Sequence, residues 1–467
     1  MEFSSYTFLF FFLPITVIAY FLTPKRGRNI TLFAANLVFY AWSEPVYVLL
    51  LLGLWILDYV SGRLIARFHT NRPTRVFILT FSLAMHILSL LVFKYQIFFP
   101  GVIERIFEEN NILMQTLVPL GISVYVFQGM SYLIDLYLNK IAVQKNIISL
   151  GTYLMFFPQM LCGPIVRYSD MGAELAHREE SINKIAKGYG FFIRGLAKKL
   201  FLADNMLAVW RSVESMGMEK VSILTAWLGL ISFVFALYYY FDGYSDMARG
   251  IGKIFGFELP INFNYPFVAK SISEFWRRWN VSLTVWLKSY VFTPLSQKTK
   301  DSFFFTTLHL LCLWLLMALW YGGRLNLLLW GLAVGLTVIF ERMFLSVLLT
   351  KLPVIIQKLY TLFFIFMTWV LFAADQVSDI PKYFFALFHG ELFDGETVYL
   401  LSGCWVVLIL CIIFSSNVWH TLSLKQDHDH PQAAVWFQIG WELFLTIGCL
   451  IFLIAVDTSA PEFFIRF

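Results

Sequence analysis

The stretch VSILTAWLGLISFVFALYYYF occupies residues 221–241 and contains no charged residue. A transmembrane α-helix needs about 20 predominantly apolar residues to cross the hydrocarbon core of a bilayer. This stretch therefore predicts a membrane-spanning helix. The following segment, DGYSDMARG (residues 242–250), places Asp242 and Asp246 on one face of a helix. The two carboxylates predict either a helix end that reaches water or an acidic wall inside a cavity.

Apolar runs of this kind recur along the whole chain, and we count about eleven candidates for membrane spans. The runs are Tyr6–Leu22, Ile30–Trp42, Val46–Ala66, Val76–Phe98, Ile112–Leu138, Val221–Phe241, Phe303–Trp320, Leu325–Leu345, Val354–Ala373, Val398–Phe414 and Trp436–Ala455.

The composition supports the same fold class. Of 467 residues, 59% are hydrophobic and 14% are charged, whereas about a quarter of a soluble domain is charged. Helices are the expected solution in lipid because they satisfy their own backbone hydrogen bonds. We therefore predict an all-α, polytopic transmembrane bundle that forms a single domain over residues 1–467.

Charge and cysteine usage argue against two other classes of protein. The net charge is +5, but the cations are dispersed among apolar runs, so no nucleic-acid partner is predicted. The five cysteines have no metal-ligand spacing and are interpreted as small hydrophobic residues. Alternating Asp427, His428, Asp429 and His430 could bind a metal, but a solvated loop at Lys425–Pro431 is the preferred interpretation, and no metal site is predicted.

The middle third of the chain departs from simple membrane spans. Gly151–Tyr168 is apolar but interrupted by two prolines and a glycine, which indicates a re-entrant loop or a kinked span. Ser181–Arg211 alternates lysines and arginines with apolar residues, as an interfacial helix does. Charges at membrane depth are tolerated where protein or a watery cavity covers them. We therefore expect the middle third to line a cavity.

The stretch SISEFWRRWNVSLTVWLK (residues 271–288) holds the densest group of polar and aromatic residues. On one continuous helix, Glu274 would pair with Arg278, and the tryptophans would share a face. One interpretation is an amphipathic helix at the bilayer surface. The alternative is a basic wall, formed by Arg277 and Arg278, that binds the phosphates of a nucleotide donor.

Two short phrases flank this region. Asn264-Tyr-Pro266 predicts an extended segment, since a residue before proline avoids the helical region. Leu319-Trp-Tyr-Gly-Gly323 follows an apolar run and predicts a turn between two helices, in which Tyr321 would be an ordinary interfacial aromatic residue.

Four phrases together resemble the membrane-bound O-acyltransferase (MBOAT) family, in particular its bacterial, alginate O-acetylation type. They occupy Phe156–Tyr168, Phe241–Gly250, Phe255–Pro266 and Ser271–Leu283, in the same order as in the family. The resemblance covers most of the chain, and the length of the phrases makes it specific.

The resemblance implies a ring of helices around a central tunnel in the bacterial inner membrane. A cytoplasmic acyl-CoA, in particular acetyl-CoA, would be the donor substrate, with no tightly bound cofactor. A polysaccharide or cell-wall polymer outside the cytoplasm would be the acceptor, with an SGNH-type transferase as partner. The candidate donor- and substrate-binding residues are Trp276, Arg277, Arg278, Trp279, Asn264, Asp246, Gln159 and Arg167.

The family's chemistry usually depends on a polar residue that ends the RRWH or RRWN phrase and on a histidine in a later W-H-G phrase. Here the first position is Asn280, and Trp320-Tyr321-Gly322 occupies the second. A histidine can act as a general base near neutral pH, whereas a tyrosine, whose usual pKa is about 10, cannot readily do so. Tyr321 can still donate a hydrogen bond to an oxyanion or, if activated, carry an acyl group.

No other histidine replaces the missing one in an obvious way. His309 lies twelve residues before Tyr321 in the same apolar run, about 18 Å away along a helix. Three functions remain open from the sequence. The first is an active O-acyltransferase, the second is a catalytically lapsed relative that serves as a scaffold or acyl conduit for a partner transferase, and the third is a transporter or channel.

Overall fold

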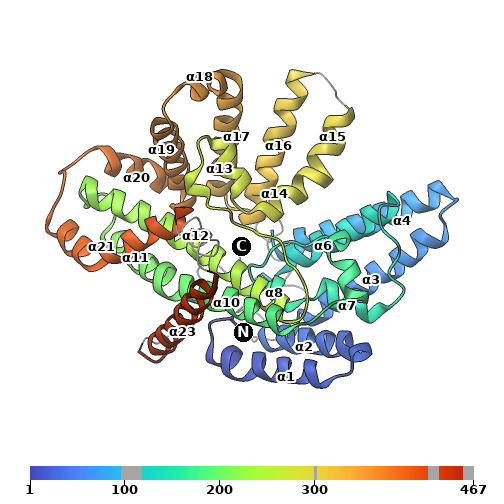
Figure 1. The fold of residues 1–467 in the computed structure, drawn as a ribbon. Coiled ribbons are helices and arrows are strands. Elements are labelled where there is room, and N and C mark those ends of the chain that lie inside the picture. The colour runs from blue at the N-terminus through green and yellow to red at the C-terminus, as the bar shows by residue number, and fades with distance from the viewer. Residues whose placement is uncertain (96–117, 299–301, 419–430, 456–467) are drawn as a thin grey trace, which may run out of the picture. The chain divides into compact units, whose positions relative to one another are not determined.

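The computed structural model describes residues 1–95, 118–298, 302–418 and 431–455. Within these ranges the chain forms helices and connecting turns and contains no strand, which confirms the all-α prediction (Figure 1). Contacts divide the chain into two units. Unit 1 contains Met1–Phe192 and Asp246–Pro260, and unit 2 contains Ile193–Ser245 and the described chain from Ile261 onward. The single domain over residues 1–467 stays a prediction.

Unit 1 begins with a π-helical turn and continues through a series of helices to the shared helix α10. Its elements are η1 (Thr7–Phe12), α1 (Leu13–Leu22), η2 (Lys25–Gly27), α2 (Arg28–Ser43), α3 (Val48–Arg67), α4 (Arg72–Phe93), α6 (Ile122–Tyr137), α7 (Ile147–Leu154), α8 (Phe157–Met160) and α9 (Tyr168–Ala176). Two helices contribute residues to both units, α10 (Ile182–Ala197) and α12 (Ile223–Ile254).

Unit 2 contains the remaining helices. They are η5 (Lys198–Ala203), α11 (Asp204–Met216), η6 (Pro266–Val268), α13 (Ile272–Arg278), α14 (Val281–Leu287), η7 (Lys288–Phe292), α15 (Thr293–Lys298), α16 (Phe303–Tyr321), α17 (Leu325–Phe340), η8 (Glu341–Leu345), α18 (Ser346–Lys351), α19 (Val354–Ala373), η9 (Val377–Asp379), α20 (Ile380–Phe388), α21 (Gly395–Ser415) and α23 (Pro431–Ala455).

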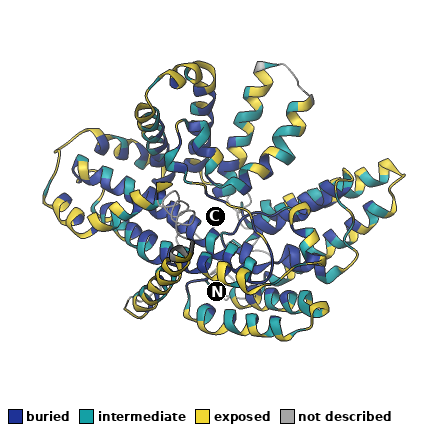
Figure 2. Cartoon of the chain, viewed as in Figure 1, coloured by how far each residue is buried: buried dark blue, intermediate teal, exposed yellow. Residues whose placement is uncertain are grey.

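Eight helical segments of the described chain are long and apolar enough to cross a membrane. They confirm a multi-pass protein, and they correspond to eight of the predicted apolar runs. The count of eleven stays a prediction, because Thr7–Leu22 and α2 are shorter helices and residues 112–117 lie outside the described ranges. In the most apolar stretch of α12, 78% of the residues are buried, whereas most residues of α21 and α23 are exposed (Figure 2).

In unit 1, helices α3, α4 and α6 pack on one another around a buried histidine–aspartate pair. His86 Nε2 of α4 lies 3.3 Å from Asp58 Oδ1 of α3, and both side chains are almost fully enclosed. A Cβ atom at Gly129 of α6 would lie 2.3 Å from Asp58 Oδ2. Glycine is required there because any side chain would displace the pair.

The broken segment at Gly151–Tyr168 is confirmed. Helix α7 ends at Leu154, the four-residue α8 follows, and α9 begins only at Tyr168. The predicted helix at Ser181–Arg211 is confirmed, because α10, η5 and α11 follow one another without a break, with a π-helical turn at Lys198–Ala203. Its position at the membrane interface stays a prediction. The lysines of its π-helical turn form ion pairs, Lys198 with Asp242 at 2.7 Å and Lys199 with Asp204 at 2.9 Å.

The prediction that Asp242 and Asp246 mark a helix end is wrong, because α12 continues to Ile254. Both carboxylates lie within this helix and are neutralised there. Asp242 is buried against Lys198, and Asp246 pairs with Arg249 at 3.0 Å. Paired charges can remain in an apolar helix because each partner replaces the water that the other has lost.

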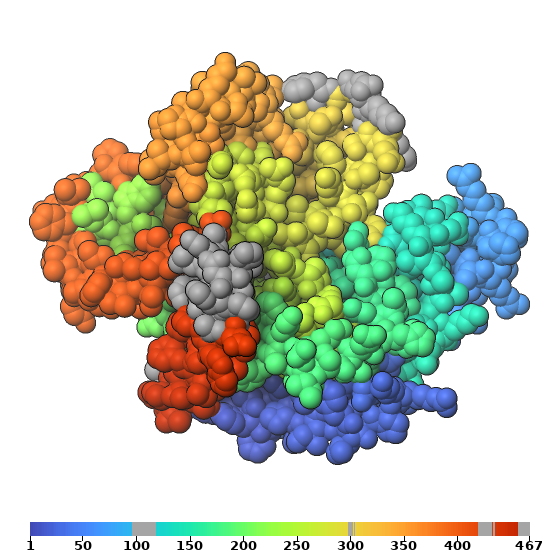
Figure 3. Space-filling model, viewed as in Figure 1, coloured from blue at the N-terminus to red at the C-terminus, as the bar shows by residue number. Residues whose placement is uncertain are grey.

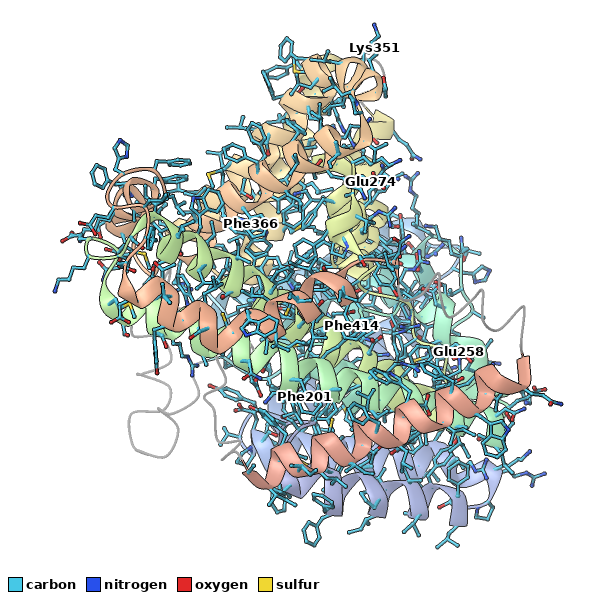
Figure 4. The ribbon with its side chains drawn as sticks, turned by 60° about the vertical axis from the view of Figure 1, so that its left-hand side comes forward. Phe201, Glu258, Glu274, Lys351, Phe366 and Phe414 are labelled. Atoms are coloured by element: carbon cyan, nitrogen blue, oxygen red, sulfur yellow. The ribbon has the colours of Figure 1, made fainter. Side chains whose placement is uncertain are left out.

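Unit 2 is held together by close helix packing. Helix α17 packs against α16 and α19, and α13 packs against both α17 and α19. In Figure 3, the yellow-green segment with α13 and α14 borders both the orange segment of α17–α19 and the yellow segment of α15–α16. Phe201 of η5 stacks edge-on against Phe452 of α23, with ring centroids 5.5 Å apart, and Figure 4 shows Phe201 facing this helix.

Where α10 crosses α12, the backbones are in direct contact. A Cβ atom at Gly243 would lie 2.7 Å from the carbonyl oxygen of Gly195. Small residues permit such close approach of helices in membrane proteins.

We expect Gly243→Ala to destabilise the protein, because the added methyl group must separate two packed backbones. Overpacking of this kind costs about 1–3 kcal/mol. Thermal unfolding of the detergent-purified protein, followed by loss of the monodisperse chromatography peak, measures the effect. Gly403→Ala on α21 is the matched control, since nothing lies within 4 Å of the position that its added methyl group would take. Equal unfolding temperatures for the two variants would contradict the close crossing.

Candidate active site

The stretch at residues 271–288 does not form the one continuous helix that was predicted. It forms α13, which ends at Arg278, and α14, which begins at Val281. Between them, Asn280 adopts the left-handed conformation, with φ 43° and ψ 58°. Asparagine tolerates this conformation better than most residues. The break turns the Asn280 side chain out of the helical register.

A short strap at residues 262–264 stabilises this break. The Asn262 carbonyl oxygen accepts the N–H of Val281 at 2.8 Å, and the Asn262 Oδ1 accepts the N–H of Ser282 at 3.1 Å. The N–H of Asn264 donates to the Arg278 carbonyl oxygen at 2.9 Å. The strap therefore satisfies backbone groups that a continuous helix would pair internally. The predicted extended segment is only partly correct, since Tyr265 is left-handed with φ 47°.

Tyr321 is the last residue of α16. Gly322 ends the helix with φ 156°, and its N–H donates to Ala318 and Leu319 carbonyl oxygens. The predicted turn between helices is confirmed, because α17 begins at Leu325. The interpretation of Tyr321 as an ordinary interfacial residue is wrong, since its side chain is 2% exposed.

The structure brings Asn280 and Tyr321 together, although 41 residues separate them. Asn280 Nδ2 donates to Tyr321 Oη at 3.4 Å, and Trp279 Nε1 donates to the same oxygen at 3.2 Å. Rings of Trp330 and Phe372 lie edge-on to Tyr321, with centroids 5.5 Å and 5.4 Å away. The result is one phenol oxygen with two N–H donors in an aromatic enclosure.

The tryptophans around this centre form a continuous cluster. Trp276 contacts Trp314 and Trp330, and Trp279 contacts Trp369, with centroid separations of 5.0–5.5 Å. The indole N–H groups of Trp276, Trp330 and Trp369 are buried without a hydrogen-bond acceptor among the described residues. An unsatisfied buried donor costs about 1–3 kcal/mol. Trp279 contacts Tyr321 directly, and Trp276 is connected to it through Trp330.

The two predicted donor-binding arginines have different environments. Arg278 Nε and Nη2 both donate to one oxygen, Glu274 Oε1, at 3.0 Å and 2.8 Å, and Arg278 Nη1 donates to the Asn264 carbonyl oxygen at 3.1 Å. Arg277 is exposed. Burial by itself raises the pKa of Glu274, but hydrogen bonds from the Lys270 N–H and from Arg278 outweigh it and lower that pKa. The predicted Glu274–Arg278 pair is confirmed, and Arg278 is part of the scaffold.

Three of the remaining candidates lie in unit 1. Gln159 of α8 is buried and accepts a hydrogen bond from Gln128. Arg167 pairs with Asp170 at 2.9 Å, and Asp246 pairs with Arg249. Their roles in substrate binding stay predictions. Asn264, Trp276, Trp279, Asn280 and Tyr321 all belong to unit 2.

His309 and the predicted loop at Lys425–Pro431 do not add to this centre. The His309 ring lies near Phe292 and Phe305, and its Nδ1 is buried without a partner in the described chain. Asp427, His428, Asp429 and His430 lie outside the described residues. Among the described residues, no group of three or more His, Cys, Asp or Glu side chains is arranged to hold a metal ion.

Two residues of the site were not found from the sequence. Asn262 forms the strap, and the buried Glu341 accepts the N–H groups of Ile272 and Ser273 at 2.6 Å and 3.0 Å. Glu341 did carry a signal, because it is a lone acid near the end of the apolar run Leu325–Leu345. An ionisable residue at membrane depth is a candidate for a special role.

We expect Arg278→Ala to lower the unfolding temperature, because it removes both the Glu274 ion pair and the link to the strap. Loss of hydrogen bonds to a charged group costs about 1.5–3 kcal/mol. Arg277→Ala is the matched control and should unfold at the wild-type temperature, since its side chain is exposed. Thermal unfolding of the two purified variants checks this. A larger loss for Arg277→Ala would contradict the assignment of Arg278 to the scaffold.

Comparison with known proteins agrees with the phrases in the sequence. Residues 121–378 match the MBOAT, membrane-bound O-acyltransferase family. The chain is 33% identical to the probable alginate O-acetylase AlgI of Pseudomonas aeruginosa, over 92% of this chain and 83% of that protein. It is 30% identical to the peptidoglycan O-acetyltransferase of Helicobacter pylori, over 81% and 78% of the two chains. The teichoic acid D-alanyltransferase of Bacillus subtilis is 28% identical over 46% of this chain and 56% of its own.

Proposed function

This chain belongs to the membrane-bound O-acyltransferase family, and we propose that it transfers an acyl group, in particular acetyl, from a cytoplasmic thioester donor to an extracytoplasmic polymer. The acceptor would be a polysaccharide or a cell-wall polymer, as the names of the alginate, peptidoglycan and teichoic acid relatives suggest. We place the protein in the bacterial inner membrane, with acetyl-CoA as donor and an SGNH-type transferase as the partner that receives the acyl group.

One observation carries this proposal. Asn280 and Tyr321, the two positions where the family's chemistry usually resides, meet at a single oxygen atom in unit 2. In the transfer, an acceptor hydroxyl attacks the thioester carbonyl carbon, a C–O bond forms, and the C–S bond breaks. The proton of the hydroxyl ends on the leaving sulfur. The carbonyl oxygen carries negative charge during this step, and nearby N–H and O–H donors stabilise it.

Tyr321 takes the role of such a donor in our proposal, rather than that of a general base. A phenol oxygen that accepts bonds from Trp279 and Asn280 can still donate its own hydrogen. The two N–H groups fix the position of the phenol and orient it. The aromatic enclosure excludes water, which strengthens an electrostatic interaction at the reacting carbonyl.

A second candidate function also has an observation in its favour. The residue at the usual histidine position is a tyrosine that is 2% exposed and surrounded by aromatic rings. A protein that has lost transferase activity could keep a buried tyrosine at this position, because it would no longer need the histidine. In that case the protein would serve as a scaffold or acyl conduit for a partner transferase.

We expect Tyr321→Phe to reduce acyl transfer by about 10²–10³-fold, the usual effect of removing one oxyanion donor. The measurement follows CoA release and polymer labelling from radiolabelled acetyl-CoA, with the protein in liposomes and its partner present. Tyr360→Phe on α19 is the control for loss of a tyrosine hydroxyl elsewhere in unit 2. Wild-type protein that never turns over with any thioester or partner would instead support the lapsed relative.

We also expect Arg277→Ala to raise the KM for acetyl-CoA several-fold, because an exposed guanidinium beside the site can pair with CoA phosphates. The effect should shrink as salt is added, since exposed charges are screened within about 8–10 Å at physiological ionic strength. Lys270→Ala, an exposed cation just before α13, serves as comparison. An unchanged KM for Arg277→Ala would favour the interpretation of α13 as a bilayer-surface helix.

A further inference from the structure

Glu341 is a buried carboxylate in an apolar environment. It begins the π-helical turn η8 at the end of α17, and its residue is 3% exposed. Its carboxylate accepts the N–H of Ile272 at 2.6 Å and the N–H of Ser273 at 3.0 Å. Burial of a charge is unfavourable unless its hydrogen-bonding capacity is well satisfied. Both carboxylate oxygens therefore have a specific structural task.

That task is to hold the N-terminus of α13. The first N–H groups of a helix have no partner within the helix, and they carry a partial positive charge. Glu341 takes two of them, and Ser271 Oγ accepts the N–H of Glu274 at 3.0 Å. The first turn of α13 is thereby attached to the end of α17.

The opposite end of α13 carries the residues that reach Tyr321. The helix has seven residues, so it is about 10 Å long, and displacement of one end displaces the other. Trp279 and Asn280 follow directly after Arg278, and their side chains donate to Tyr321 Oη. The attachment at Glu341 therefore sets where these two donors lie.

Helix α17 also fixes the position of Tyr321. Trp330 of α17 lies edge-on to the Tyr321 ring. A Cβ atom at Gly331 would lie 2.7 Å from the Trp314 carbonyl oxygen of α16, so the two helices are in close contact. Helix α17 thus positions both sides of the site. It contacts α16, which carries Tyr321, and through Glu341 it holds α13, which is followed by Trp279 and Asn280.

We infer that Glu341 is a positioning residue, which sets the register between Asn280 and Tyr321 by attaching α13 to α17. It touches no reacting atom, and its catalytic consequence rests on the acyl transfer proposed above. Small displacements within a catalytic group can lower a rate by about 10²-fold. Loss of the Glu341 carboxylate should therefore reduce turnover more than it reduces donor binding.

The experiment combines two readouts on the full chain in nanodiscs. The first is kcat and KM for acetyl-CoA in Glu341→Ala and Glu341→Gln. The second is the ¹⁹F resonance of 3-fluorotyrosine incorporated at position 321, which reports the surroundings of the phenol whether or not the protein turns over. Glu341→Gln keeps the side-chain volume and one acceptor oxygen, so we expect it to fold even if the alanine variant fails to do so.

Asp394→Asn is the matched control, because Asp394 is also a carboxylate that caps a helix. It accepts the N–H of Thr397 at 2.8 Å at the start of α21, away from α13, α16 and α17. We expect the Glu341 variants to lower kcat about 10–100-fold with little change in KM, and to shift the ¹⁹F resonance, whereas Asp394→Asn does neither.

The outcomes separate the two proposals. A ¹⁹F shift in the Glu341 variants of a protein that shows no transfer activity would support the positioning role and count against the acyl transfer. An unshifted resonance in Glu341→Ala and Glu341→Gln would overturn the positioning role, even if transfer is confirmed. An equal shift in Asp394→Asn would also overturn it, since the effect would then be a general loss of stability.

Discussion

The left-handed turn at Asn280 is the constraint on which the rest of the candidate site depends. It ends α13, starts α14 and directs the Asn280 amide toward Tyr321. A continuous helix through this position would keep Asn280 in helical register and would leave the strap at residues 262–264 without the backbone groups that it binds. The break is stabilised from both sides, by the strap after the turn and by Glu341 before it.

The tyrosine at position 321 has a clear physical meaning in this setting. A histidine at the end of α16 could remove and return a proton near neutral pH, whereas a tyrosine supplies a hydroxyl for hydrogen bonding. The surroundings suit a phenol, because Trp330 and Phe372 pack edge-on to its ring while Asn280 and Trp279 satisfy its oxygen. The side chains around position 321 therefore fit a tyrosine in both shape and hydrogen bonding.

Much of the fold could be predicted from the sequence, because placing polar side chains in the hydrocarbon core of a membrane is unfavourable. Spanning helices are therefore visible as local apolar runs. Apolar runs such as Val354–Ala373 form helices with the predicted bounds, and the prolines and glycine of Gly151–Tyr168 break that segment as expected. The family phrases also identified Asn280 and Tyr321 as the two candidate catalytic positions. The local sequence pattern gave the wrong conformation where a distant contact decides it, as at Asn280. The turn there depends on hydrogen bonds that the N–H groups of Val281 and Ser282 donate to Asn262.

Charged residues were the hardest to interpret, because the sequence does not show which partner each one meets. Arg277 and Arg278 are adjacent and identical in type, yet one is exposed and the other is bound to Glu274 and Asn264. The pattern around Asp242 predicted a helix end or a cavity wall, but Lys198 of the preceding π-helical turn neutralises this carboxylate. Glu341 lies in a run that is apolar on average, so hydropathy alone did not single it out. A lone acidic residue in such a run is nevertheless a candidate for a special role.

The proposed acyl transfer requires Asn280 and Tyr321 to form one reaction centre for a thioester. An electron cryo-microscopy structure of the protein in nanodiscs, with a non-hydrolysable thioether analogue of acetyl-CoA, tests it most directly. We expect density for the acyl end within hydrogen-bonding reach of Tyr321 Oη and Asn280 Nδ2. Density for the acyl end elsewhere in the protein, with Tyr321 still enclosed by Trp330 and Phe372, would contradict it.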